Sequence, residues 1–311
     1  MIVSFVIPAF QAGQTIGETL RSVFAAPLPQ GWSLDVLVAN DASPDDDAQR
    51  AVVETFGGVK YLSHSPNQGK CAAMNLAIPH TRGAVVILLD ADDGLVQDWA
   101  TRLCSILETW PAGAPLCFSA CRTQDGESTV SQPDYSGPLS LHDILNERHM
   151  GEYLPMFRGD ALRAQGYRDP EQPYGCELWT YLGFAEHAEL WISAEVLRIY
   201  RTDRPDAISA TIYNRHTAAQ VARCYDLVFA DFAPAYRTHA PRNFARRRLR
   251  QAVFTALSGH RARAFQLWRQ AARRDAFWET LAALALIISG PTATNIVVGL
   301  AKKARLLRRF G

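Results

Sequence analysis

The sequence predicts an α/β fold in which helices flank a mostly parallel sheet and a basic, helical C-terminal region follows. Of the 311 residues, 48% are apolar and 20% are charged, which is typical of a globular chain with a large core and excludes intrinsic disorder. In the first hundred residues, short apolar runs alternate with amphipathic segments. That alternation indicates βαβ units, in which successive strands are parallel.

Four apolar runs in this part of the chain are the predicted strands. Their apolar character is continuous rather than alternating, which indicates strands that are buried on both faces of the sheet. The runs are Ile2–Ile7, Leu34–Ala39, Val59–Leu62 and Val85–Leu89. The amphipathic segments between them are the predicted helices, near Gln14–Ala26, Asp45–Phe56 and Lys70–Ile78.

After Asp90 the predicted strands and helices no longer alternate regularly. Four further segments have helical patterns, namely Gly94–Trp110, Ser140–Glu147, Asp160–Gln165 and Cys176–Glu186. Strands are predicted over Leu116–Arg122 and Val196–Arg201, with a loop or hairpin over Gln124–Pro138. Residues 216–311 are mostly helical in pattern, so we expect one domain over residues 1–210 and a helical region over residues 211–311.

The N-terminus and the cysteines predict a cytoplasmic protein. The first ten residues, MIVSFVIPAF, have no basic region and only a short apolar run, which indicates a buried strand rather than a signal peptide. The six cysteines lie far apart, without a C-x-x-C pair or the spacing of a zinc site. We therefore expect reduced thiols.

Charge is divided very unevenly along the chain. Residues 1–231 contain 16 Lys and Arg against 29 Asp and Glu, whereas residues 232–311 contain 16 against 2. This division predicts that the C-terminal region contacts an anionic partner, either nucleic acid or a lipid surface. The C-terminal region lacks the interleaved aromatic and basic residues that are typical of nucleic-acid recognition, so we expect no nucleic-acid partner.

Polar side chains gather where the predicted parallel strands end, which is where such sheets bind ligands. Lys70 follows a glycine at the start of a helix, where the helix dipole and the ammonium together favour a phosphate. The segment is not a P-loop, because residue 64 is His and residue 71 is Cys. The candidate residues are Pro8, Phe10, Asn40, Asp41, Asn67, Gly69, Lys70, Asp90, Asp92 and Asp93.

The acidic segment Asp90-Ala91-Asp92-Asp93 follows the fully apolar strand VVILL. Carboxylates at such a boundary are costly unless they are solvated, paired or metal-bound. Carboxylate oxygens are ligands for the hard cations Mg²⁺ or Mn²⁺, which would clamp a diphosphate and neutralise the leaving group. A solvated turn that caps the next helix is the alternative. Asp41 likewise allows two interpretations, a helix N-cap or a carboxylate that binds a base or ribose.

Five segments together resemble one known family. They are VSFVIPAFQAGQTIGETLRSV, DVLVANDASPDD, NQGKCAAMNLAIPHTRGAVVILLDADD, YGCELWTYL and LRIYRTDRPDAIS. In order and spacing, residues 2–209 resemble family 2 glycosyltransferases. The resemblance implies a GT-A, Rossmann-like fold that binds a nucleotide-diphosphate sugar and transfers the sugar with inversion.

The resemblance also implies a role for each candidate residue. Base and ribose would contact Pro8, Phe10 and Asp41, with Asn40 beside them, and the pyrophosphate would lie near Lys70 with Asn67 and Gly69 in the same loop. Asp90 would face the ribose and the metal, Asp92 would hold the metal, and Asp93 would support both.

Two positions depart from the family pattern. The family usually takes its catalytic base from a Glu-Asp pair that opens a helix, and here the matching stretch is Cys176-Glu177, so Glu177 is the expected base. A first-turn Glu that only interacts with the helix dipole is the alternative, and Glu171, Glu186 and Glu189 are the other candidate bases. Asp203 stands where relatives commonly carry His, and its carboxylate would be a third metal ligand, with a solvated loop aspartate as the alternative.

The last third of the chain predicts attachment to a membrane surface. Thr280–Ala301 is a stretch without formal charge, and the basic cluster Lys302–Arg309 follows it. We expect helices that lie in the interface, with Arg242–Arg250, Arg261–Arg274 and the terminal cluster on anionic headgroups. A helical subdomain packed on the core and a membrane span are the alternatives, and Gly290-Pro291 disfavours the span.

The leading hypothesis is therefore a metal-dependent inverting glycosyltransferase, peripheral on the inner face of the cell membrane. It would move a sugar from a UDP-sugar to a glycan or glycolipid acceptor in the synthesis of a surface polysaccharide. A sugar nucleotidyltransferase shares the sheet but expects a glycine-rich basic loop where this chain has PAFQAGQT. A catalytically degenerate relative is the other alternative, which the broken Glu-Asp pair suggests.

Overall fold

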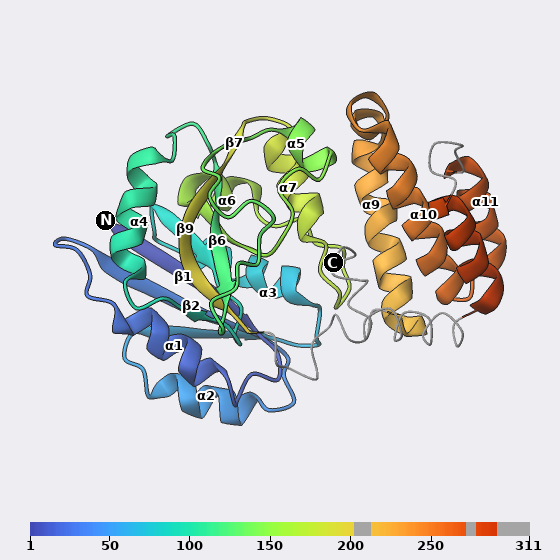
Figure 1. The fold of residues 1–311 in the computed structure, drawn as a ribbon. Helices are drawn as coiled ribbons and strands as arrows, with labels where there is room; N and C mark the ends of the chain where they lie inside the picture. Colours follow the sequence, from blue (N-terminus) through green and yellow to red (C-terminus); the bar gives the residue numbers. More distant parts are fainter. Residues whose placement is uncertain (202–212, 272–277, 291–311) are drawn as a thin grey trace. The chain divides into compact units, whose positions relative to one another are not determined.

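The structure, a computed structural model, describes residues 1–201, 213–271 and 278–290. The chain divides into two compact units, which are described separately (Figure 1). The first unit contains Met1–Ile144 and Arg148–Asp203, and the second contains Leu145–Glu147 and Arg204–Gly311. The domain boundary expected at residue 210 lies outside the described residues.

Within the described residues, nine strands form one sheet in the first unit. Its order is β3-β2-β1-β4-β8-β6-β9-β5, with β7 paired to β9. The first four strands are mutually parallel, β8 runs antiparallel between β4 and β6, and β6 and β9 are parallel. The strands are β1 (Ile2–Ala9), β2 (Ser33–Asp41), β3 (Val59–His64), β4 (Val85–Leu88), β5 (Gly94–Leu95), β6 (Leu116–Thr123), β7 (Gly137–Leu139), β8 (Tyr153–Arg158) and β9 (Leu190–Tyr200).

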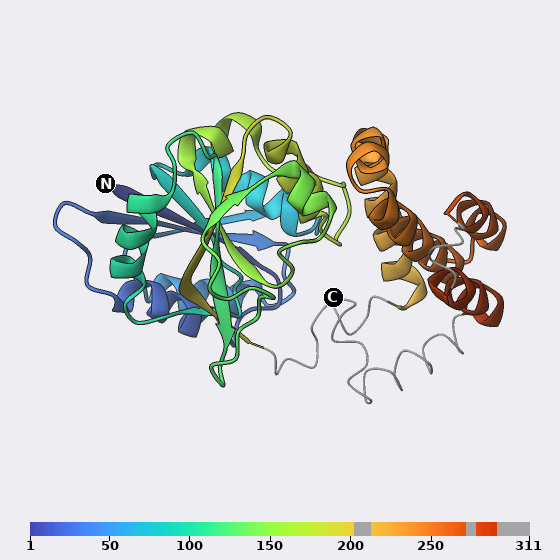
Figure 2. The same ribbon diagram turned by 45° about the horizontal axis from the view of Figure 1, so that its top comes forward.

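Helices cover both faces of this sheet (Figure 2). The side chains of β1 alternate between the two faces, so that Phe5 packs with α1, α2 and α4, and Val6 packs with α3, α6 and α7. Trp99 of α4 meets Phe5 edge to face, with ring centroids 5.1 Å apart. The helices are α1 (Ile16–Ala25), α2 (Asp46–Glu54), α3 (Lys70–Ala77), η1 (Ile78–His80), α4 (Trp99–Thr109), α5 (Leu141–Leu145), α6 (Gly159–Gln165) and α7 (Glu177–Ala185).

The predicted α/β fold is confirmed, with differences after Asp90. The predicted helix over Gly94–Trp110 begins only at Trp99, because Gly94–Leu95 instead pairs with β9. Gly137–Leu139, at the end of the predicted loop, is a short strand that also pairs with β9. The central strand β8 was not predicted, since Pro155 interrupts its apolar run and proline disfavours inner strands.

The described part of the second unit is helical, as predicted. It contains α9 (Arg215–His239), α10 (Pro241–Leu257), α11 (Arg261–Ala271) and a helical segment over residues 278–290. Ala252 and Ala256 of α10 form a buried cluster with Ala264 and Leu267 of α11 and with Ile287. No helix among the described residues is both long and apolar enough to cross a membrane.

Candidate active site

The candidate site lies at the carboxyl ends of the parallel strands, which is where sheets of this kind bind their ligands. Strands β1 and β2 run slightly further than predicted, so that Pro8, Asn40 and Asp41 belong to their last residues. Asp90 follows β4, and Lys70 and Glu177 are the first residues of α3 and α7. The first turns of two helices therefore face the end of one strand.

Lys70 links Asp90 to Glu177. Its ammonium Nζ lies 2.6 Å from Asp90 Oδ1 and 2.7 Å from Glu177 Oε1. Burial disfavours the charged ammonium, but the two carboxylates outweigh this effect and hold the pKa of Lys70 well above its ordinary value. Burial raises the pKa of Asp90, whereas Lys70 and Arg198 lower it, and the net pKa is below the ordinary value. Three residues predicted separately thus form one ion-paired chain.

Gly69 allows this chain to form. Its φ is +100°, a conformation that residues with a side chain rarely adopt. A Cβ atom there would lie 2.3 Å from the carbonyl oxygen of Gln172 and 2.8 Å from Cα of Pro173. The segment that leads to Glu177 therefore packs directly on the backbone that precedes Lys70.

Asp41 holds the same loop from the other side. It is 4% exposed. Its carboxylate accepts hydrogen bonds from the amides of Gln68 and Gly69, both at 2.8 Å, and from Asn67 Nδ2 at 2.9 Å. His64 Nε2 lies 2.7 Å from the same carboxylate. Asp41 is not a helix cap, because the N-cap of α2 is Asp45.

Asn40 is buried and fixes the turn after β2. Its side chain donates to Asp46 Oδ1 at 2.7 Å and accepts from the Ser43 amide at 3.1 Å. Ser43 Oγ in turn accepts from the amide of Gln11, which ties this turn to the loop after β1. At the start of that loop Phe10 is 46% exposed, so that its ring is accessible to a ligand.

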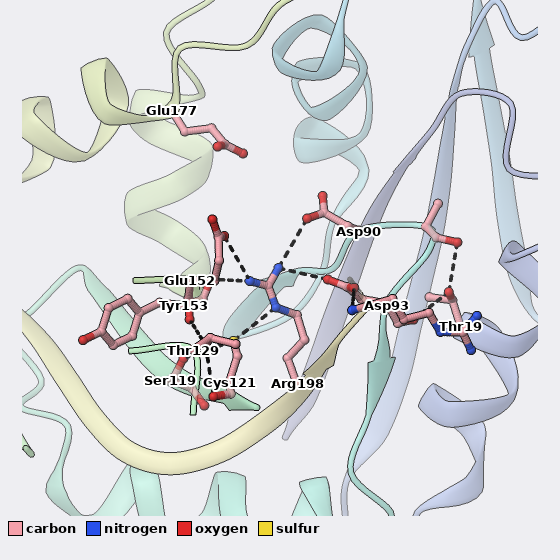
Figure 3. Close-up of polar contacts among 12 residues, drawn as sticks. Thr19, Asp90, Asp93, Ser119, Cys121, Thr129, Glu152, Tyr153, Glu177 and Arg198 are labelled. Atoms are coloured by element: carbon pink, nitrogen blue, oxygen red, sulfur yellow. Dashed lines mark hydrogen bonds and ion pairs between the residues drawn. The ribbon is translucent and has the colours of Figure 1, made fainter. Parts of the chain in front are cut away.

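Arg198 of β9 lies beneath the site and is 3% exposed (Figure 3). Its guanidinium Nη1 lies 3.3 Å from Asp90 Oδ2 and 3.2 Å from Asp93 Oδ2. Its Nη2 lies 3.7 Å from Glu152 Oε2. The Nε donates to Cys121 Sγ at 3.1 Å. The positive charge of this one buried side chain is thus shared by three acidic side chains of the site.

Asp93 is the interior member of the acidic segment. It is 2% exposed, and its Oδ1 accepts from the Arg201 amide at 2.9 Å. Its carbonyl accepts from Thr19 Oγ1 at 2.7 Å, which fixes the turn against α1. Burial raises the pKa of Asp93 to about 7 although Arg198 opposes the shift. The segment does not cap the next helix, since the N-cap of α4 is Asp98.

The carboxylates that the structure describes in the site are suitable ligands for a divalent cation, but they do not form a complete set of metal ligands by themselves. Among the described residues, no three His, Cys, Asp or Glu side chains are arranged to hold a metal ion. Mg²⁺, however, is usually bound by one or two carboxylates together with waters and substrate phosphates. Asp203, a predicted ligand, lies outside the described residues. Four acidic side chains contact Lys70 or Arg198 and outnumber these two cations, namely Asp90, Asp93, Glu152 and Glu177.

The sequence did not single out Arg198 or Glu152. An arginine inside the apolar run VLRIY was the available signal for Arg198, because a charge in an inner strand requires carboxylate partners. Glu152 precedes the unpredicted strand β8, and no motif contains it.

Comparisons with known proteins agree with this architecture. A family model, Glycosyl transferase family 2, matches residues 4–159. The succinoglycan biosynthesis protein ExoM of Rhizobium meliloti is 35% identical over 107 residues, which are 32% of this chain and 33% of that protein. The bactoprenol glucosyl transferase of Shigella phage SfX is 24% identical over 164 residues, 51% of this chain and 53% of that protein. The aligned part is about half or less of the length of these relatives.

Solved structures show the same fold at low sequence identity. S. aureus TarS 1-349 in complex with UDP-GlcNAc has a TM-score of 0.60 at 13% identity, covering 90% of this chain and 92% of that chain. The mannosyltransferase PcManGT from Pyrobaculum calidifontis, in complex with GDP-Man and Mn²⁺, has a TM-score of 0.53 at 20% identity, covering 94% and 86%. The expected GT-A type of fold is thereby confirmed. Since the family model matches half of the chain, this protein belongs to glycosyl transferase family 2.

Proposed function

We propose that this glycosyltransferase moves a sugar with inversion from a UDP-sugar to a hydroxyl group of a glycan or glycolipid acceptor. ExoM is named a succinoglycan biosynthesis protein and the phage relative a bactoprenol glucosyl transferase, which supports a role in making a surface polysaccharide. TarS in complex with UDP-GlcNAc supports the choice of a UDP-sugar.

The observation that carries the proposal is the ion-paired chain from Asp90 through Lys70 to Glu177. It joins the end of a parallel strand, where nucleotides bind, to a carboxylate that can accept a proton. Glu177 takes the proton of the acceptor hydroxyl while that oxygen forms its bond to C1 of the sugar. The bond from C1 to the diphosphate oxygen breaks, and its electron pair leaves with the diphosphate. Attack opposite the leaving group inverts C1.

Lys70 orients both carboxylates and faces the leaving group. An ammonium has three N–H donors, of which Asp90 and Glu177 engage two. A third donor at the start of α3 suits a phosphate oxygen, because the helix dipole adds positive potential there.

Mg²⁺ or Mn²⁺ would be held by Asp92 and Asp90 together with phosphate oxygens of the donor. When bound, the cation neutralises charge on the diphosphate as it leaves. The surplus of carboxylates over cations in the site supports this assignment, as does PcManGT in complex with GDP-Man and Mn²⁺. Asp203 stays a predicted third ligand.

The nucleoside would bind at the ends of β1 and β2. The exposed ring of Phe10 can stack on a base, and Pro8 lies two residues before it in the sequence. Asp41, Asn40, Asn67 and Gly69 would contribute through the hydrogen bonds that fix the loops after β2 and β3 beside the nucleoside.

The second unit would attach the enzyme to the inner face of the cell membrane. In the segment 278–290, Trp278, Leu281 and Ile288 are 75%, 45% and 61% exposed, whereas Ala283 and Ile287 are buried. At 100° per residue the three exposed side chains lie on one face, opposite the buried pair. Exposed arginines on α11 complement anionic headgroups.

Some arginines predicted for lipid contact have protein partners instead. Arg247 lies 2.7 Å from Glu147, and Arg263 lies 2.6 Å from Asp226. The predicted terminal cluster, residues 302–309, lies outside the described residues.

A thermal-shift panel tests the donor class. UDP-, GDP- and dTDP-sugars are added with and without Mn²⁺, and binding to the native state raises the melting temperature. We expect the largest shift with a UDP-sugar and Mn²⁺, and transfer or slow donor hydrolysis with the same compound. Binding without any turnover would favour the degenerate relative, and no shift with any nucleotide sugar would contradict the proposal.

A further inference from the structure

Glu152 is an acidic residue of the site that the mechanism above does not use. Its backbone is held by Thr129, since its amide donates to the Thr129 carbonyl at 3.3 Å and its carbonyl accepts from Thr129 Oγ1 at 2.8 Å. The close approach requires Gly151, where a Cβ atom would lie 2.3 Å from the Thr129 carbonyl oxygen. The main chain of Glu152 is therefore fixed, like that of the other site residues.

The carboxylate of Glu152 is oriented but accessible. Its Oε2 lies 3.7 Å from Arg198 Nη2, beyond hydrogen-bond distance, and its side chain is 58% exposed. Figure 3 shows Glu152 and Asp90 on either side of the Arg198 guanidinium, with Glu177 beyond them. Partial burial raises the pKa of Glu152 above its ordinary value, Arg198 lowers it, and the negative charges of Glu177 and Asp90 raise it further.

The carboxylates of the site differ in their partners and in their exposure. Asp90 and Glu177 share Lys70, and Asp93 is buried against Arg198. Glu152 contacts Arg198 only at 3.7 Å and more than half of its side chain is exposed, so its oxygens can accept hydrogen bonds from a ligand. A ligand that offers several hydroxyl donors matches such an acceptor.

We propose that Glu152 accepts hydrogen bonds from hydroxyl groups of the transferred sugar and that Arg198 positions it. The inference rests on the proposed function, because it requires a nucleotide sugar at this edge of the sheet. A carboxylate in this position selects neutral sugars and repels a sugar that carries its own carboxylate, such as a uronic acid.

Calorimetric titration of the full chain with Mn²⁺ separates sugar contacts from nucleotide contacts. The probes are the tightest-binding neutral nucleotide sugar of the UDP, GDP and dTDP series and its nucleoside diphosphate. Glu152→Ala should weaken binding of the nucleotide sugar about 10- to 100-fold, the worth of hydrogen bonds to a charged group, and leave the nucleoside diphosphate unchanged. Glu152→Gln, which keeps one acceptor oxygen, should recover part of the loss. Glu54→Gln, at the exposed last residue of α2, is the control and should change neither.

The outcomes distinguish this inference from the proposed function. Suppose that the wild-type protein binds a nucleotide sugar and that Glu152→Ala still prefers this sugar to the nucleoside diphosphate as strongly as wild type does. The inference is then wrong and the proposed function stands. An equal loss for both probes would also overturn the inference, because it would assign Glu152 to the nucleotide. If wild type binds no nucleotide sugar, both fail.

Arg198→Lys tests the positioning role. Because Arg198 contacts Asp90, the variant should bind both the nucleotide sugar and the nucleoside diphosphate more weakly. Because Arg198 also contacts Glu152, the variant should in addition lose part of its preference for the nucleotide sugar over the diphosphate. The second effect should vanish when Glu152 is already Ala. The same reduction in both backgrounds would overturn the positioning role of Arg198.

Discussion

The ammonium of Lys70 lies 2.7 Å from the carboxylate of Glu177, although the two residues begin different helices far apart in the sequence. The same ammonium lies 2.6 Å from Asp90. A single side chain therefore connects the acidic segment expected to hold the donor with the carboxylate expected to accept the proton.

Replacing Glu177 by Gln removes the proposed base while preserving size. We expect turnover to fall by a factor of about 10²–10⁴, the usual contribution of a general base, with much less effect on donor binding. Steady-state kinetics and calorimetry of the donor check both parts. Glu54→Gln, at the exposed last residue of α2, is the control. Near-normal turnover would move the base to another carboxylate, with Glu152 the first to examine.

Asp92→Asn weakens the proposed metal site without changing its volume. Turnover should fall at least about 100-fold, because a bound cation supplies several kcal/mol of charge stabilisation. The melting temperature without donor should stay near that of wild type, and EDTA should abolish wild-type activity. Full activity in EDTA would rule out the metal, whatever the variant does.

Gly69→Ala should strain the loop that brings Lys70 to Glu177. Both the positive φ and the close approach of Gln172 oppose a methyl group, with an expected loss of about 1–3 kcal/mol in the free energy of unfolding. Gly57→Ala is the control, since a Cβ there meets nothing within 4 Å. Urea denaturation compares the two. Equal stabilities would mean that the loop does not need glycine at residue 69.

Asp35 should make stability depend on pH. It is buried and accepts from Ser4 Oγ at 2.7 Å and from the Arg82 amide at 2.9 Å. Burial raises the pKa of Asp35, but these hydrogen bonds outweigh it and the net pKa lies below the ordinary value. A lowered folded-state pKa stabilises the protein above the unfolded-state pKa, and that contribution is lost as pH falls through the folded-state pKa.

Asp35→Asn should therefore lower the free energy of unfolding by about 1–3 kcal/mol near neutral pH. The difference from wild type should shrink below about pH 4. Denaturation across the pH range checks this, with Asp125→Asn as an exposed control. A difference that is the same at every pH would show that Asp35 acts through shape rather than charge.

Membrane attachment should depend on the apolar face of residues 278–290. Replacing Trp278, Leu281 and Ile288 together by Ser should reduce binding to anionic vesicles at least about tenfold, because each apolar side chain contributes when it leaves water. Met150→Ser, at an exposed apolar residue of the first unit, is the control. Flotation measures binding. If the triple variant floats with the vesicles as well as wild type does, this apolar face does not contribute and the arginines would have to account for binding. If wild type itself does not float with the vesicles, the membrane proposal is wrong.

The sequence predicted the individual residues of the site better than their contacts. Asp90, Lys70 and Glu177 followed from strand ends and family resemblance, yet their ion pairs depend on how the loop before α7 packs on Gly69. That packing joins segments about a hundred residues apart, which no local pattern encodes. Asp41 was predicted to face the ligand, and its hydrogen bonds to the loop after β3 required the loop conformation.

The second half of the sheet was harder to predict for a related reason. Strand β5 has two residues and exists through its pairing with β9, and β8 contains Pro155. Both take their place from neighbours that are distant in the sequence. The roles of Arg198 and Glu152 depend on that half of the sheet, and they were therefore not predicted.

A crystal structure of the full chain with a UDP-sugar and Mn²⁺ would place the donor relative to these residues. We expect the diphosphate between Lys70 and Asp92, the anomeric carbon facing Glu177, and sugar hydroxyls within hydrogen-bond distance of Glu152. A donor bound at another edge of the sheet, or one whose anomeric carbon faces away from Glu177, would contradict this arrangement.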